Sequence, residues 1–70
     1  MTRSKTAGQI LKSARLKKDW TQAQVAEKAG LHVNTYAKIE RGVSRPEYES
    51  AAKLMKALDI DPSLLPQLLK

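Results

Sequence analysis

Residues 21 to 30 form a short segment in which both ends carry the signals of a helix terminus. Thr21 and Gln24 have the spacing of a capping box, in which each side chain accepts a hydrogen bond from the other residue's backbone amide. Gly30 suits the left-handed conformation that ends a helix. Between these ends the apolar residues recur at helical spacing, at Val25, Ala26 and Ala29. The segment predicts an amphipathic helix of only about two turns.

A second short helix is expected after a turn of three to four residues. It runs from about Val33 to Arg41 and is closed by Gly42. The spacing places Tyr36 and Ile39 on its core face. The opposite face carries Asn34, Ala37, Lys38 and Arg41, with Val33 beside them, and this outward stripe contains no acidic residue.

The remaining apolar periodicities are helical too. One helix is predicted from Thr6 to Lys18, on the stripe Ala7, Ile10, Leu11 and Ala14, and another on the stripe Tyr48, Ala51, Ala52, Met55 and Leu58. Asp61 and Pro62 restart a helix as its N-cap and first residue, and Pro66 restricts residues 61 to 70 to one short turn or two fragments. No segment alternates with the period of a strand. The sequence therefore predicts a compact all-α domain of four to five helices.

Length and composition bound the class of protein. Seventy residues are enough for a single small domain, residues 1 to 70, of ordinary globular composition. Cysteine is absent, and His32 has hardly any partners for a metal, so we expect no metal and no cofactor. The chain has no stretch of membrane-spanning length, and its start lacks the apolar core of a signal peptide. We expect a cytoplasmic protein that does not enter a membrane.

Positive charge is concentrated in the first two thirds of the chain. Residues 1 to 45 carry ten basic and three acidic side chains, whereas residues 46 to 70 carry three and four. Residues 1 to 5 have no apolar periodicity and are expected to form a mobile basic arm. Such segregation is typical of a face that binds a polyanion.

Residues 21 to 42, TQAQVAEKAGLHVNTYAKIERG, resemble the helix-turn-helix of the lambda-repressor-like family of bacterial and phage regulators. The resemblance covers about residues 7 to 65, and it places the helix-turn-helix itself at residues 21 to 41. It implies that the second of the two short helices lies in the DNA major groove while the first crosses the backbone.

The same resemblance implies roles for individual side chains. Val33, Asn34 and Lys38 match base-reading positions, and their side chains suit a thymine methyl, adenine and guanine in turn. For Asn34 the alternative is a local cap, and for Lys38 a solvated charge. Contacts to the DNA backbone are expected from Gln22, Thr35, Arg41, Ser44 and Arg45, and from Arg3 and Lys5 in the arm, although Thr35 could instead flank the core. Arg15 and Glu40 match a partly buried ion pair.

Four residues depart from the family pattern or need a second interpretation. Asp19 replaces the usual glycine before Thr21, which predicts a distorted first turn. His32 stands where, in this family, a serine often caps the second of the two short helices. Tyr36 is a core residue whose hydroxyl must reach solvent or a partner. Trp20 is expected to pack beneath the first short helix rather than to stack on bases.

The C-terminal leucines are predicted to form a dimer contact, because the other apolar stripes already cover one another. This interface, within residues 60 to 70, comprises Ile60, Leu64, Leu65, Leu68 and Leu69. In the alternative arrangement Leu64 and Leu65 fold back onto Trp20 and the first helix, which leaves only Leu68 and Leu69 free.

The leading functional interpretation is a transcriptional regulator, expected to be a repressor, that binds a pseudo-palindromic double-stranded operator as a homodimer. It leaves open a phage, restriction-modification or antitoxin setting, with RNA polymerase or a cognate toxin as a further partner. A protein-interaction module is the alternative, although the basic outer face disfavours it. An enzyme is not expected, because the sequence has no paired carboxylates in an apolar setting and no nucleophile–base set.

Overall fold

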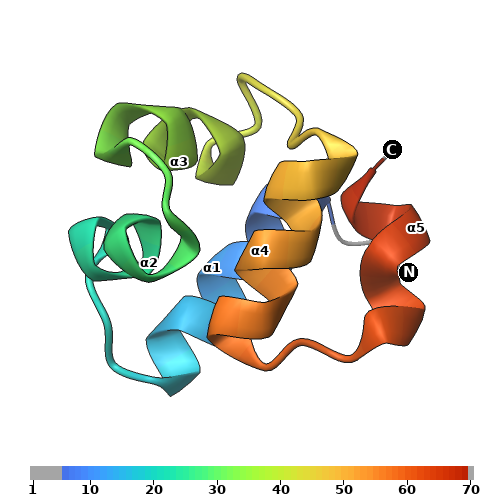
Figure 1. The fold of residues 1–70 in the computed structure, drawn as a ribbon, viewed down its shortest axis with the longest axis horizontal. Helices are drawn as coiled ribbons and strands as arrows, with labels where there is room; N and C mark the ends of the chain where they lie inside the picture. The colour runs from blue at the N-terminus through green and yellow to red at the C-terminus, as the bar shows by residue number, and fades with distance from the viewer. Residues whose placement is uncertain (1–5, 70) are drawn as a thin grey trace, which may run out of the picture.

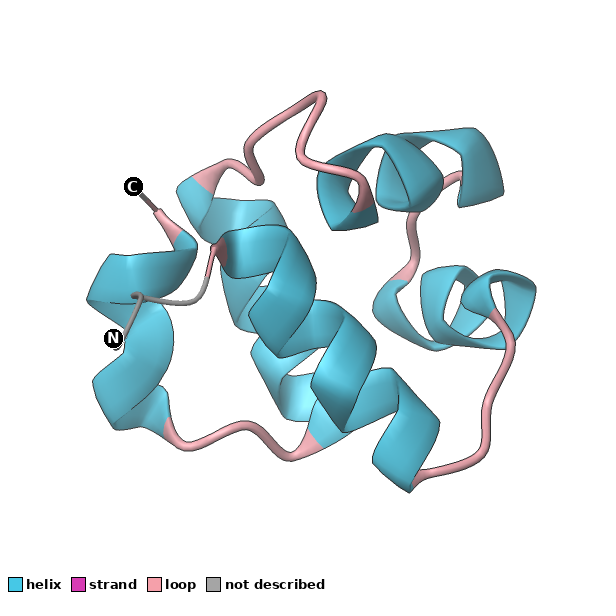
Figure 2. Ribbon diagram, turned by 180° about the vertical axis from the view of Figure 1, so that it is seen from behind, coloured by secondary structure: helices cyan, strands magenta, loops and turns pink. Residues whose placement is uncertain are grey.

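The computed structural model describes residues 6–69, which form short helices joined by loops, without a strand in that range (Figure 2). In chain order the elements are α1 (Ala7–Lys17), α2 (Gln22–Ala29), α3 (Val33–Glu40), α4 (Tyr48–Leu58), the 3₁₀ turn η1 (Pro62–Leu64) and α5 (Leu65–Leu68). The all-α class predicted from the apolar spacing is confirmed.

α1 and α4 run side by side through the middle of the molecule (Figures 1 and 2). α2 and α3 lie on one side of this pair and α5 lies on the other. α2 packs on both α3 and α4, and α3 also contacts α1. The two helices of the predicted motif are thus supported from behind by two longer helices.

Capping boxes begin both α1 and α2. At α2 the Thr21 hydroxyl accepts from the Gln24 amide at 3.1 Å and the Gln24 side chain accepts from the Thr21 amide at 2.8 Å, as predicted. At α1 the pair Thr6 and Gln9 does the same at 3.2 and 3.0 Å. The predicted start at Thr6 is correct, but the capping box there was not predicted, although its Thr-x-x-Gln spacing is visible in the sequence.

A single apolar core joins every helix. Its buried members are Ile10, Leu11, Val25, Ala26, Ala29, Tyr36, Ile39, Ala51, Leu54, Met55, Leu58, Ile60 and Leu68. Trp20 packs against this core while partly buried, as predicted. The core includes a residue from α5, so the C-terminal segment is part of the folded domain.

The predicted inward face of α4 was wrong at two positions. Tyr48 is 62% exposed and Ala52 is exposed, whereas Leu54 is fully buried. Leu54 lies three residues after Ala51 and four before Leu58, so these three side chains share one face. Tyr48 instead occupies the first turn of α4, beside the loop that follows α3.

Gly8 allows α1 to approach the end of α3 closely. A β-carbon at this position would overlap the Glu40 carbonyl oxygen and lie 2.8 Å from the Ile39 carbonyl oxygen. These are backbone atoms, so no side chain can rotate away to make room. This close approach was not predicted, although a glycine within a helical apolar pattern is a signal for it in the sequence.

The C-terminal segment consists of two fragments, which was one of the two predicted alternatives. Asp61 begins η1 by accepting a hydrogen bond from the Ser63 amide at 2.9 Å, and this bond lowers the pKa of the exposed carboxyl. Pro66 lies in the first turn of α5, where its missing N–H costs no helical hydrogen bond.

Candidate nucleic-acid interface

The turn between α2 and α3 is tight because Gly30 adopts a left-handed conformation, with φ of 71°. The Leu31 amide then donates to the Ala26 carbonyl at 2.8 Å, which closes the end of α2. α3 begins at Val33, only three residues after Gly30. This geometry sets the start of α3 at the surface, next to α2.

His32 caps α3. Its Nδ1 accepts a hydrogen bond from the Asn34 amide at 3.2 Å. The imidazole therefore takes the place of the serine usual in the family. The cap of α3 is thus the His32 ring, which leaves the Asn34 side chain exposed for other contacts.

The outward face of α3 is polar and cationic. Val33 is 39% exposed, and Tyr36 and Ile39 on the opposite face are buried as predicted. The face also carries the exposed side chains of Asn34, Thr35, Lys38 and Arg41. Thr35 lies on the exposed surface, so it does not contribute to the core.

The loop after α3 folds back against that helix. The Val43 and Ser44 amides both donate to the Lys38 carbonyl, at 2.9 and 3.3 Å, and Gly42 has φ of 82°. Pro46 is buried and anchors the far end of the loop. The two predicted backbone-contacting residues of the loop, Ser44 and Arg45, are exposed beside the end of α3.

The predicted ion pair between α1 and α3 is present. Arg15 Nε donates to Glu40 Oε2 and Arg15 Nη2 donates to Glu40 Oε1, both at 2.9 Å. The two side chains are only 12% and 4% exposed. Arg15 Nη1 also donates to the Trp20 carbonyl at 2.9 Å, which fixes the turn between α1 and α2.

Gln22 joins the same cluster. Its Nε2 donates to Glu40 Oε1 at 2.9 Å, a bond that links the first residue of α2 to the last residue of α3. Burial alone would raise the pKa of Glu40, but the hydrogen bonds from Arg15 and Gln22 outweigh it and lower that pKa. This bond was not predicted from the sequence, because residues 18 positions apart carry no local signal.

The Tyr36 hydroxyl is a buried polar group without a hydrogen-bond partner in the described chain. Burial raises the pKa of this phenol, and the nearby Glu40 carboxylate raises it further. Tyr36 therefore stays neutral, and its hydroxyl is buried near the Glu40 carboxylate rather than reaching solvent.

The turn before α2 tolerates the replacement of glycine. Asp19 adopts φ of 59°, so it takes the left-handed conformation directly. The Lys18 and Lys28 ammonium groups lie 5.2 and 4.7 Å from the centre of the Trp20 ring. These cation–π contacts hold the ring against α2, which agrees with a packing role for Trp20.

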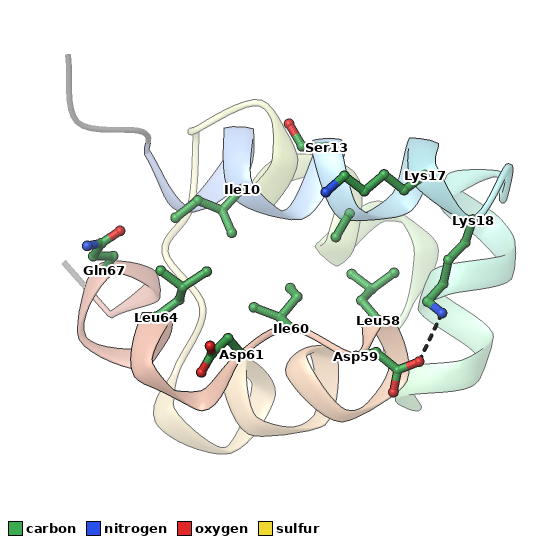
Figure 3. A pocket seen from close by; sticks show the side chains of 11 residues that line it. Ile10, Ser13, Lys17, Lys18, Leu58, Asp59, Ile60, Asp61, Leu64 and Gln67 are labelled. Atoms are coloured by element: carbon green, nitrogen blue, oxygen red, sulfur yellow. Dashed lines mark hydrogen bonds and ion pairs between the residues drawn. The ribbon is translucent and has the colours of Figure 1, made fainter. Parts of the chain in front are cut away.

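A groove of about 660 Å³ lies between α1 and the segment that joins α4 to α5 (Figure 3). Its apolar lining includes Ile10, Leu58, Ile60 and Leu64, and its rim includes Lys17, Lys18, Asp59 and Asp61. Asp59 pairs with Lys18 at 2.9 Å and Asp61 caps η1. Both carboxylates thus have structural partners.

The structure corrects part of the predicted dimer contact. Leu68 is fully buried and Ile60 is 9% exposed, so both belong to the core of the monomer and cannot cover a partner. Leu64 and Leu65 are partly buried against the same core, and Leu69 is 36% exposed. The apolar tail folds back because its short helix packs on both α1 and α4.

Some predictions fall beyond the part of the chain described. Arg3 and Lys5 lie outside it. Among the described residues, no helix is long and apolar enough to span a membrane. The same residues bring no three histidine or acidic side chains together as ligands for a metal ion.

Comparison with known families agrees with this geometry. A family model described as helix-turn-helix matches residues 11–65, which include α2, the Gly30 turn, α3 and α4. No curated protein and no solved structure matches the chain significantly. The matched span covers most of the chain, and it contains the capped α2 and the exposed face of α3. The chain belongs to the lambda-repressor-like helix-turn-helix family of DNA-binding regulators.

Proposed function

We propose that this regulator binds a specific double-stranded DNA operator as a homodimer, with α3 in the major groove, and represses transcription by occluding RNA polymerase. One observation carries the proposal: the outward face of α3 presents Val33, Asn34 and Lys38 to solvent without an acidic neighbour on that face. The proposed partner is double-stranded DNA, so the proposed location of the protein is the cytoplasm, at the nucleoid.

The exposed side chains suit distinct base edges. Asn34 offers both a donor and an acceptor, as adenine requires, and Lys38 donates to the acceptors of guanine. Val33 offers methyl groups to thymine. Contacts to phosphate are proposed for Gln22, Thr35, Arg41, Ser44 and Arg45, with Arg3 and Lys5 extending the contact.

A homodimer is proposed because one recognition helix reads only a few base pairs. Two copies with helices about 34 Å apart would read successive major grooves on one side of the duplex. Because Ile60 and Leu68 are buried in the core, the remaining candidates for the two-fold contact are Leu64, Leu65 and Leu69. Leu69 offers the largest exposed apolar surface of the three.

Selection from a random DNA library, followed by binding titrations, tests the proposal. Lys38→Ala should weaken binding to the selected sequence by roughly 1–3 kcal/mol and relax the preference at one base pair per half-site. Lys56→Ala removes the same charge from the exposed surface of α4 and should change neither the affinity nor the base-pair preference. Failure to enrich any sequence, or equal losses for the two variants, would reject specific readout through α3.

A further inference from the structure

Three donors converge on the Glu40 carboxylate from two other helices. Arg15 uses both carboxylate oxygens, and Gln22 Nε2 shares Oε1 at 2.9 Å. All three side-chain nitrogens of Arg15 are engaged in the cluster, toward Glu40 and the Trp20 carbonyl. Gln22 Nε2 donates one N–H to Glu40 and has a second N–H that can donate to another molecule.

The carboxylate determines which end of the Gln22 amide faces inward. A carboxylate only accepts hydrogen bonds, whereas a side-chain amide has a donating nitrogen and an accepting oxygen. Turning the amide over would place its oxygen against Glu40 Oε1 and leave two acceptors in contact. The buried charge of Glu40 thus selects one of two sterically similar amide orientations.

We infer that Glu40 is a positioning residue for DNA binding, which holds the Gln22 amide so that its second N–H points to a phosphate. This inference rests on the proposed function, in which the start of α2 meets the DNA backbone. Gln22 is partly buried and is the first residue of α2, so its side chain connects the core cluster to the surface. The ion pair then serves both the packing of α1 on α3 and the contact to phosphate.

A double-mutant cycle separates this role from stability. Gln22→Ala should weaken operator binding roughly five-fold, as expected for one hydrogen bond. Glu40→Met should give a similar loss, because the amide loses its anchor, and it should add nothing in the Gln22→Ala background. All four proteins are titrated well below their melting midpoints, with circular dichroism confirming that each is folded.

Glu40→Gln is the conservative control. Its carbonyl oxygen will occupy the Oε1 position, where the donors of Arg15 and Gln22 meet, so Gln22 keeps its acceptor. We expect this variant to retain most of the affinity while melting at a lower temperature than the parent. Equal affinity losses for Glu40→Gln and Glu40→Met, or a full loss from Glu40→Met in the Gln22→Ala background, would overturn the inference.

Failure of the proposed function has a different signature. If Gln22→Ala binds the operator as tightly as the parent, the phosphate contact itself is wrong. Nuclear magnetic resonance of the parent protein gives a second test, which does not depend on whether a variant folds. When operator is added, the chemical shift of one Gln22 side-chain amide proton should change. The shift of the other amide proton, which is hydrogen-bonded to Glu40, should stay the same. Loss of the signal from the amide proton that is hydrogen-bonded to Glu40 would show that DNA replaces Glu40 as its acceptor. That result would contradict a positioning role for Glu40.

Discussion

Single atoms decide how closely the helices of this domain approach one another. At Gly8 even one methyl group would meet the backbone of Ile39 and Glu40. Alanine favours a helix by about 1 kcal/mol over glycine, but forcing a methyl group into filled space costs roughly 1–3 kcal/mol. We therefore expect Gly8→Ala to lower stability in urea unfolding. Ser13→Ala, at an exposed position of α1, is the matched control and should be neutral or slightly stabilising.

The Arg15–Glu40 pair is expected to stabilise the fold more than a surface pair does. Arg15→Met leaves the Glu40 charge only 4% exposed and without its main partner. The cost should exceed the ~0.2–1 kcal/mol of an exposed pair and approach roughly 3–5 kcal/mol. A thermal midpoint within error of the parent would show that the pair contributes little.

The same pair predicts acid sensitivity. The folded state lowers the pKa of Glu40 below its usual value of 4.5, so its stabilising effect is present above that pH and disappears as the pH falls through the folded-state pKa. The difference in melting midpoint between the parent and Glu40→Gln should therefore be largest near neutrality and shrink below about pH 4. Asp61 also titrates in acid, but it is common to both proteins and cancels. A difference that does not change between pH 7 and 3 would contradict this assignment.

At the scale of an element, α3 depends on an unusual cap. His32→Ala should remove the hydrogen bond to the Asn34 amide and cost about 1 kcal/mol of stability. His32→Ser restores an oxygen acceptor at the same position and should keep the stability of the parent. Chemical denaturation of both variants measures the contribution of the cap to the free energy of unfolding. Equal losses of stability for the alanine and serine variants would show that the ring stabilises α3 by another contact.

At the scale of the whole molecule, the proposed DNA complex should depend strongly on salt. If a dimer neutralises roughly eight phosphates, the logarithm of affinity should fall against the logarithm of salt concentration with a slope of about −7. Titrations at a series of salt concentrations measure this slope. A slope near half that value would indicate that one copy binds at a time.

Assembly can be tested at an exposed position. Leu69→Lys leaves the core intact and places a charge on the proposed two-fold contact. We expect an unchanged melting midpoint in dilute solution together with weaker dimerisation in analytical ultracentrifugation and weaker operator binding. A parent protein that sediments as a monomer at high micromolar concentration would refute a stable dimer in the absence of DNA.

Local signals in the sequence determined the helices, because caps and left-handed turns depend on hydrogen bonds within about four residues. Thr21, Gln24 and Gly30 therefore marked α2, and the spacing of Tyr36 and Ile39 oriented α3. The family resemblance supplied the Arg15–Glu40 pair. Only the tertiary structure decided that Leu68 closes the monomer core and that Gln22 reaches Glu40. These contacts depend on how separate helix faces meet in space, which no spacing along the chain encodes.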